Sequence, residues 1–253
     1  MKVTLVQMDI KWEDSAANRE AAEQFILDAP RSDIYVLPEM WNTGFTIHPE
    51  GIAEEDGDSL EWMKRMSNTL NAAICGSIAT KNNSFFYNRL YFVTPNSEVQ
   101  HYDKRHLFTY GKENLSYTAG TERVIATWRG VRFLLQICYD LRFPCFSRNN
   151  NDYDAVIYVA SWPQSRIHVW HTLLCARAIE NQCYAIGVNR TGNDPLCKYN
   201  GSSEVYDAYG HCIISCGNSP SSQTFDIDMK SLNAFKDKFP VLHDQDYICF
   251  IKE

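Results

Sequence analysis

The sequence predicts an α/β fold built on mixed sheets, and two observations carry this prediction. Residues 3–38 contain an apolar run, a helix-like segment and a second apolar run, which is the pattern of a β-α-β unit. Residues 72–102 contain three apolar runs joined by short polar turns, as antiparallel strands do. Parallel and antiparallel strands are therefore expected within the same sheet.

Four segments have the spacing of helices: residues 14–29, 58–70, 168–182 and 229–238. The first can be capped by Asp14 and is closed by Pro30. Apolar stripes predict which face of each of the first three packs on a sheet. These stripes are Ala17, Ala21, Phe25 and Ile26; Leu60, Met63, Met66 and Leu70; and Val169, Leu173, Ala176 and Ile179.

The second half of the chain is predicted to return repeatedly to strands. They are expected at residues 123–128, 131–137, 155–160, 183–189, 203–206, 211–215 and 223–227, with a short helix at residues 145–149. Residues 207–210 form the turn of a hairpin. The apolar tail at residues 247–251 is expected to pack across a subunit interface or on its own sheet.

Composition limits the class of protein. A chain of 253 residues is expected to form one domain, residues 1–253. The net charge of -7 argues against nucleic-acid binding, which needs a clustered basic surface. The amino terminus lacks a signal-peptide cleavage site, and no apolar run reaches the roughly 20 residues of a membrane helix. Nine cysteines without a disulfide framework are typical of a reduced, cytoplasmic, soluble protein.

Three residues with chemical potential stand where strands end. Cys138 follows the apolar run of residues 131–137, and Pro144 closes a tight elbow whose backbone N–H groups are not all used by a sheet. Glu39 ends a second apolar run, and Lys104 lies in a polar turn after a third. A cysteine alone at a strand end is usually a small buried hydrophobe. The three strand ends together point to a site.

Four motifs in this order resemble the nitrilase-type carbon–nitrogen hydrolase superfamily over nearly the whole chain. They are Leu-Pro-Glu-Met-Trp at residues 37–41, Tyr-Asp-Lys-Arg-His-Leu-Phe at 102–108, Cys-Tyr-Asp-Leu-Arg-Phe-Pro at 138–144 and Ser-Trp-Pro at 161–163. The resemblance implies a four-layer α-β-β-α sandwich of two mixed sheets flanked by helices. It also implies a homodimer or higher oligomer, a small-molecule amide substrate, and neither a metal nor an organic cofactor.

The resemblance implies covalent catalysis of amide hydrolysis. Cys138 would attack the carbonyl carbon, Glu39 would accept the thiol proton and pass it to the leaving ammonia, and water would then hydrolyse the thioester. Lys104 would depress the pKa of the cysteine and, with the backbone N–H of Tyr139, stabilise the oxyanion. Glu113 corresponds in position to a second glutamate of the family, although a loop glutamate is by default a solvated surface charge.

Other chemistries remain open on the residues alone. A cysteine–histidine pair is the main alternative, and His106 is the nearest histidine to Lys104 in the chain. The resemblance instead makes the lysine the active-site member of that motif. Two pairs that could belong to a metal site lack further ligands at a fixed spacing: His168 with His171, and Cys212 with Cys216.

Within the superfamily the motifs look most like the omega-amidase branch, which deamidates 2-oxoglutaramate and 2-oxosuccinamate. A substrate carboxylate needs a cation in the pocket, because burying an unpaired charge is costly. Arg142 and Arg166 are the candidates. Arg142 could instead brace the elbow through backbone carbonyls, and Arg166 could cap a surface. Trp162 and Phe45 are expected to form pocket walls.

Four other functions remain open alongside the omega-amidase. The substrate could be an N-carbamoyl compound, a simple aliphatic amide or a nitrile, each hydrolysed through the same three residues. The fourth is a non-catalytic partner-binding protein on the same scaffold, which the presence of all three chemical residues disfavours.

Overall fold

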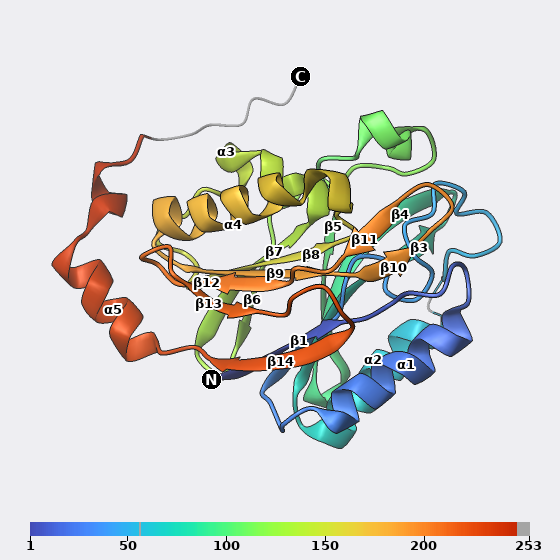
Figure 1. Ribbon diagram of the computed structural model, residues 1–253, viewed down its shortest axis with the longest axis horizontal. Helices are drawn as coiled ribbons and strands as arrows, with labels where there is room; N and C mark the ends of the chain where they lie inside the picture. The colour runs from blue at the N-terminus through green and yellow to red at the C-terminus, as the bar shows by residue number, and fades with distance from the viewer. Residues whose placement is uncertain (56, 247–253) are drawn as a thin grey trace.

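The computed structural model describes residues 1–55 and 57–246 and contains two six-stranded sheets packed face to face (Figure 1). In spatial order the first sheet comprises β14 (Ser221–Asp226), β1 (Lys2–Gln7), β2 (Ile34–Val36), β3 (Ala73–Asn82), β4 (Phe85–Thr94) and β5 (Glu98–Asp103). The second comprises β13 (Cys212–Ser215), β12 (Glu204–Tyr206), β9 (Tyr184–Asn189), β8 (Ala155–Ala160), β7 (Val131–Ile137) and β6 (Ile125–Trp128).

Both sheets are mixed, as the sequence predicts. In the first, β1, β2 and β3 run parallel, and β14, β4 and β5 add antiparallel pairs at its two sides. In the second, β7, β8 and β9 run parallel, flanked by antiparallel β6, β12 and β13. The carboxyl ends of the parallel strands therefore lie at one edge of each sheet, where open α/β sheets place ligands.

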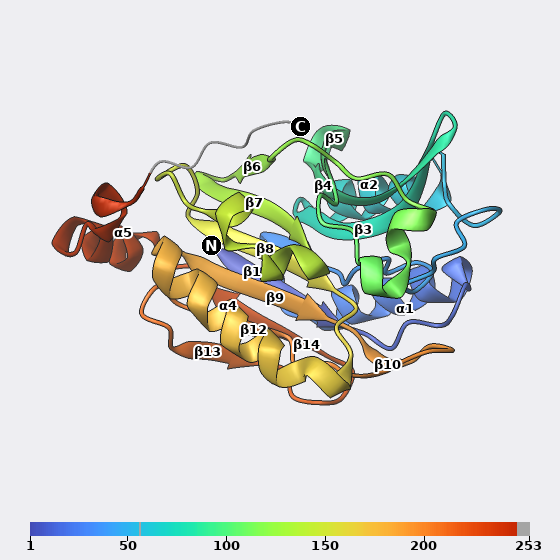
Figure 2. The same ribbon diagram turned by 90° about the horizontal axis from the view of Figure 1, so that it is seen from above.

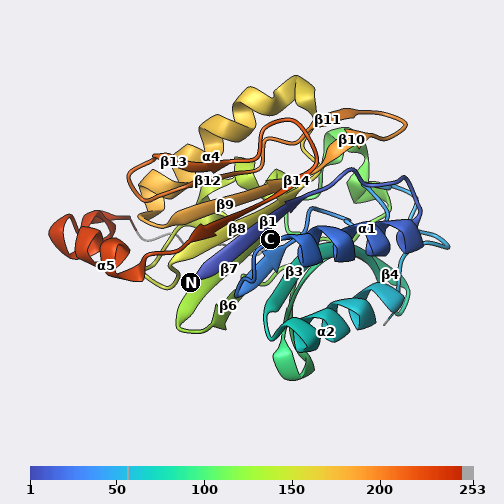
Figure 3. The ribbon, with the colours of Figure 1, turned by 60° about the horizontal axis from the view of Figure 1, so that its bottom comes forward.

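Helices cover the outer faces of the two sheets. Figure 3 shows α4 (Ile167–Asn181) on one side of the stacked sheets and α1 (Ser15–Asp28) and α2 (Asp58–Leu70) on the other. Between the sheets lies a core to which both contribute; Phe92 and Phe133, for example, stack with ring centroids 5.9 Å apart. The four-layer α-β-β-α arrangement is confirmed. Among the described residues, none of the helices has the length and apolarity to cross a bilayer.

Two short helices stand apart from these layers. The helix α3 (Pro144–Ser147) follows the turn that begins at Cys138, where a helix at residues 145–149 was expected. The helix α5 (Met229–Lys238) lies at one end of the molecule, far from α1 (Figure 2). Its bounds are those that the sequence predicts, as are the bounds of α2, β7 and β8.

The predicted buried stripe of α4 is wrong by one residue. Trp170, Leu174 and Ala178 are buried there, whereas Ile179 is 49% exposed. Arg177 lies on the buried face because its guanidinium donates to the carbonyl of Leu141, at 2.5 Å. A polar side chain that finds a partner can be buried, and a purely apolar stripe does not reveal it.

The predicted stripe of α1 is confirmed at Ile26 and is displaced by one residue before it. Its buried residues are Asn18, Ala22 and Ile26, and Asn18 is accommodated because its amide donates to the carbonyls of Lys11 and Asn42. The hairpin of β10 (Thr191–Asn193) and β11 (Lys198–Asn200) is absent from the predicted strands. The predicted apolar tail at residues 247–251 lies outside the described residues.

Candidate active site

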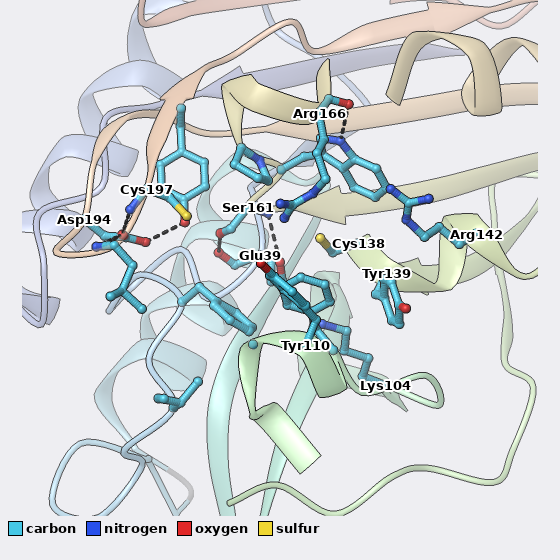
Figure 4. Close-up of a pocket in the computed structure, with 18 residues that line it drawn as sticks. Glu39, Lys104, Tyr110, Cys138, Tyr139, Arg142, Ser161, Arg166, Asp194 and Cys197 are labelled. Carbon is cyan, nitrogen blue, oxygen red and sulfur yellow. Dashed lines mark hydrogen bonds and ion pairs between the residues drawn. The ribbon is translucent and has the colours of Figure 1, made fainter. Parts of the chain in front are cut away.

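The structure brings Glu39, Lys104 and Cys138 to one cavity of about 380 Å³ (Figure 4). Glu39 follows β2, Lys104 follows β5, and Cys138 follows β7 as the first residue of the 3-10 helix η4 (Cys138–Arg142). The two sheets thus deliver their strand ends to the same place. Residues that are 65 and 34 positions apart in the chain meet there, as their positions at strand ends predict.

Lys104 forms the centre of a buried charge cluster. Its Nζ lies 2.8 Å from Oε1 of Glu39 and 2.9 Å from Oε2 of Glu113, and all three side chains are fully buried. Burial disfavours the charged ammonium, but the attraction of Glu113 and Glu39 outweighs it and raises the pKa of Lys104. The lysine is therefore a permanent cation at neutral pH.

Further donors fix the two carboxylates around the lysine. The side-chain amide of Asn88 donates to Oε1 of Glu39 at 2.8 Å and to Oε1 of Glu113 at 3.0 Å. The backbone N–H of Ser161 donates to Oε2 of Glu39 at 2.9 Å, and that of Phe108 donates to Oε2 of Glu113 at 2.6 Å. Each carboxylate is held by donors from separate elements, which preorganises the cluster.

Glu113 lies behind Lys104, in the 3-10 helix η3 (Glu113–Leu115). As a lone loop glutamate it was expected to be solvated, and only the family resemblance placed it near the site. It is in fact fully buried. Burial raises the pKa of Glu113, although Lys104 opposes this by stabilising the ionised form.

Cys138 adopts a backbone conformation that is rare for its residue type. Its φ of 43° lies in the left-handed region, which non-glycine residues enter mainly at constrained sites. Tyr139 is the second residue of η4, and the first N–H groups of a helix have no partner within it. The turn therefore presents the sulfur together with backbone donors.

The electrostatics of Cys138 differ from the expectation in one respect. Lys104 does lower the pKa of the thiol, but burial and the negative charge of Glu39 outweigh it, so that the pKa of Cys138 is raised. The expected lowering by Lys104 is thus present, but it is smaller than the two opposing effects. A thiol with a raised pKa needs a base to remove its proton before the sulfur can act as a nucleophile.

The four predicted substrate-binding residues, Phe45, Arg142, Trp162 and Arg166, all line the same cavity. Figure 4 labels the two arginines among them. The guanidinium of Arg142 lies 5.3 Å from the ring centroid of Trp162, and that of Arg166 lies 5.4 Å from that of Phe108. No described residue forms an ion pair or a side-chain hydrogen bond with either guanidinium. The alternative in which Arg142 braces the elbow is not observed.

The model of the carbon-nitrogen hydrolase family matches residues 2–237. The chain belongs to the carbon–nitrogen hydrolase family. Over 97% of both chains it is 41% identical to the omega-amidase YafV of Escherichia coli strain K12. Over 96% of both it is 33% identical to a 2-oxoglutaramate amidase of Bacillus subtilis. A crystal structure of a family protein from Xanthomonas campestris, with an arsenic adduct in its active site, has a TM-score of 0.96 at 38% identity, covering 99% of this chain and 98% of that one.

Sequence reasoning about this carbon–nitrogen hydrolase missed one wall of its cavity. The β10–β11 hairpin contributes Asp194, Leu196, Cys197 and Tyr199. Asp194 is held in the turn because its carboxylate accepts from the backbone N–H of Leu196 at 2.8 Å, from that of Cys197 at 2.7 Å and from the hydroxyl of Tyr199 at 2.5 Å. Strands β10 and β11 have three residues each and no alternation of apolar and polar residues. The sequence pattern therefore does not predict this hairpin.

The geometry of this hydrolase supports neither a cysteine–histidine pair nor a metal site. The ring of His106 lies against Asp140, with Nδ1 2.8 Å from Oδ1, and stacks on Phe143 at 4.0 Å between centroids, outside the cavity that holds Cys138. Within residues 1–55 and 57–246, no three histidine, cysteine or acidic side chains are grouped as a metal site. His171 instead lies 2.7 Å from Glu204.

Proposed function

We propose that this carbon–nitrogen hydrolase is an omega-amidase, which releases the amide nitrogen of 2-oxoglutaramate or 2-oxosuccinamate as ammonia through a thioester on Cys138. The observation that carries the proposal is the pair Arg142 and Arg166, which line the cavity of Cys138 without an acidic partner among the described residues. A buried substrate carboxylate requires such a cation. Similarity to the omega-amidase of E. coli supports the same substrate class.

In the first half of the reaction Glu39 accepts the thiol proton while the sulfur of Cys138 attacks the amide carbon. The raised pKa of the thiol makes this transfer necessary. The ammonium of Lys104 and the N–H of Tyr139 stabilise the negative oxygen of the tetrahedral intermediate. Glu39 then passes its proton to the nitrogen, the carbon–nitrogen bond breaks, and ammonia leaves a thioester behind.

In the second half Glu39 accepts a proton from water, whose oxygen attacks the thioester carbon. Lys104 and Tyr139 stabilise the second oxyanion. When this intermediate collapses, the carbon–sulfur bond breaks, the sulfur takes back the proton from Glu39, and the carboxylic acid leaves. Glu113 keeps Lys104 aligned by accepting two hydrogen bonds from it, at 2.9 and 3.1 Å.

Substrate recognition follows from the walls of the cavity. Arg166 and Arg142 would bind the carboxylate of the 2-oxo acid by charge-assisted hydrogen bonds. Both guanidinium groups lie over aromatic rings, which support a planar cation while leaving its N–H edge free. Trp162 and Phe45 form apolar walls for the short carbon chain.

We also propose that the enzyme acts in the cytoplasm, as a single domain over residues 1–253 that forms a homodimer or higher oligomer. This part rests on the family resemblance, on the negative charge and on the absence of a disulfide framework from the sequence. Sedimentation at several protein concentrations measures the assembly directly.

The test is an ammonia-release assay over a panel of 2-oxo acid amides, glutamine, N-carbamoyl amino acids, aliphatic amides and nitriles. The proposal expects 2-oxoglutaramate or 2-oxosuccinamate to have the highest kcat/KM. If an N-carbamoyl compound or a neutral amide is preferred, the protein is a hydrolase but the proposed substrate class is wrong. No turnover of any panel compound by folded protein would favour a non-catalytic binding role.

A further inference from the structure

We propose that Asp140 is a positioning residue, which holds the turn that bears Cys138 against the loop that bears Lys104. The inference rests on the proposed roles of these two residues and assigns a function to a third that does not touch the substrate. Cys138 and Lys104 come from different sheets, yet both must contact the same reacting carbonyl (Figure 4). Some fixed connection between their two segments is therefore required.

The contacts of Asp140 supply this connection. The side chain is fully buried, and each oxygen has two polar partners. Oδ2 accepts from the hydroxyl of Tyr102 at 2.8 Å and from the backbone N–H of Ile137 at 2.9 Å. Oδ1 accepts from the backbone N–H of His106 at 3.0 Å and lies 2.8 Å from Nδ1 of the same residue. One carboxylate thus joins the segment that bears Lys104 to the turn that bears Cys138.

The positions of these partners in the chain show that the carboxylate of Asp140 connects the residues around Lys104 to those around Cys138. Tyr102 and His106 lie two residues before and two residues after Lys104, so that the carboxylate grips the lysine segment from both sides. Ile137 and Asp140 also flank Cys138, one residue before it and two residues after it. A shift of the carboxylate would therefore move the lysine relative to the sulfur.

A simpler role would be to cap the short helix η4, for which the bond from Ile137 N–H suffices. The bonds from Tyr102 and His106 add nothing to a cap, because they come from the other sheet and its following loop. The left-handed backbone of Cys138 also requires support from its surroundings. Contacts on both sides of the interface between the segments favour positioning over capping.

Asp154 offers a matched control. It is also a buried carboxylate, and it accepts from the backbone N–H of Arg132 at 3.1 Å and from the guanidinium of that residue at 2.8 and 3.0 Å. Lys236 lies 3.4 Å away. None of these partners lines the catalytic cavity. Loss of this carboxylate should reduce stability without moving the reacting groups.

The experiment compares the full-length wild type with the variants Asp140→Asn, Tyr102→Phe and Asp154→Asn. It measures kcat and KM for the best amide of the panel, and thermal unfolding. Because a small misplacement of reacting groups can reduce rate about 100-fold, we expect Asp140→Asn to lower kcat by about tenfold to 100-fold with KM changed less than about threefold. Tyr102→Phe should lower kcat by about threefold to tenfold.

The double variant Tyr102→Phe/Asp140→Asn should be no slower than Asp140→Asn, because both changes act through the same carboxylate. Asp154→Asn should keep kcat within about twofold of wild type. The inference is overturned if the folded Asp140→Asn variant keeps the kcat of wild type. It is also overturned if Asp154→Asn lowers kcat as much as Asp140→Asn does. Should Asp140→Asn fail to fold, wild-type kcat in Tyr102→Phe overturns it.

A second readout separates this inference from the proposed function. The rate at which iodoacetamide alkylates Cys138, followed by peptide mass mapping, needs no substrate. If wild type turns over no panel compound, the proposed function fails, and the alkylation rate still tests positioning. A rate in Tyr102→Phe and Asp140→Asn equal to that of wild type then contradicts the inference, whereas a changed rate with Asp154→Asn unchanged supports it.

Discussion

Glu113 accepts two hydrogen bonds from the ammonium of Lys104, with Nζ to oxygen distances of 2.9 and 3.1 Å, in a space closed to solvent. The lysine consequently faces two carboxylates, Glu39 and Glu113, instead of one. This pairing keeps the lysine charged and leaves Glu39 only partly neutralised. This sharing of the cation supports the proposed role of Glu39 as the base.

Replacing Glu113 by glutamine tests this sharing. The neutral side chain keeps the shape but loses a charge-assisted hydrogen bond worth about 1.5–3 kcal/mol, so kcat should fall by about tenfold to 100-fold. Steady-state ammonia release measures the effect, with Glu122→Gln as a surface control because Glu122 is exposed. If the folded Glu113→Gln variant keeps the kcat of wild type, Glu113 does not contribute to catalysis.

The raised pKa of Cys138 predicts an unusual pH dependence of its reactivity. The thiolate is the reacting form, so alkylation by iodoacetamide at pH 7 should be slower than for free cysteine and should still increase above the ordinary pKa of about 8.5. Glu39→Gln removes a negative charge that raises this pKa, and should therefore speed alkylation at pH 7. Slower alkylation in Glu39→Gln would contradict the electrostatic account.

The unpaired arginines predict a selective loss of affinity for charged substrates. Replacing Arg166 or Arg142 by alanine should lower kcat/KM for 2-oxoglutaramate by about tenfold to 100-fold in at least one case, through loss of a charge-assisted hydrogen bond. Turnover of a neutral aliphatic amide should change little. Lys198→Ala removes an exposed cation of the β10–β11 hairpin outside the cavity, and serves as the control. Equal losses for charged and neutral amides would argue against carboxylate recognition.

Asp154 predicts how stability depends on pH. Although burial opposes it, hydrogen bonding to Arg132 holds the pKa of Asp154 below its ordinary value. A carboxyl group whose pKa is lower in the folded protein stabilises the fold at pH values above its pKa in the unfolded chain, which is about 3.9. This stabilisation is lost as the pH falls through the pKa of the folded protein. Asp154→Asn should lower the free energy of unfolding at pH 7 by about 1–3 kcal/mol. Urea unfolding from pH 7 to pH 3 should show a smaller decline for the variant than for wild type.

The sequence predicts the strands and helices best where burial is apolar. The bounds of β7 and β8 are correct because β8 is apolar throughout and β7 is interrupted only by Arg132 and Gln136, as is usual for buried parallel strands. The face of α4 is wrong because Arg177 and Asn181 are buried by their hydrogen bonds. Two of the partners are distant in the chain: Arg177 donates to the carbonyl of Leu141, and Asn181 accepts from the backbone N–H of Asn149.

The candidate site divides in the same way. Glu39, Lys104 and Cys138 could be found because each ends an apolar strand. Glu113 gives no local sign, since its burial arises from Lys104 and the N–H of Phe108. The role of Asp140 depends likewise on contacts between segments far apart in sequence. Only the folded chain reveals such partners.

The most direct test of covalent catalysis is ammonia release by Cys138→Ala with the best amide of the panel. Cys145→Ala is the matched control, because Cys145 is an exposed cysteine of the next short helix and does not line the cavity. The account predicts no release above buffer by Cys138→Ala and wild-type release by Cys145→Ala, with both variants folded. Sustained turnover by Cys138→Ala would contradict a thioester mechanism.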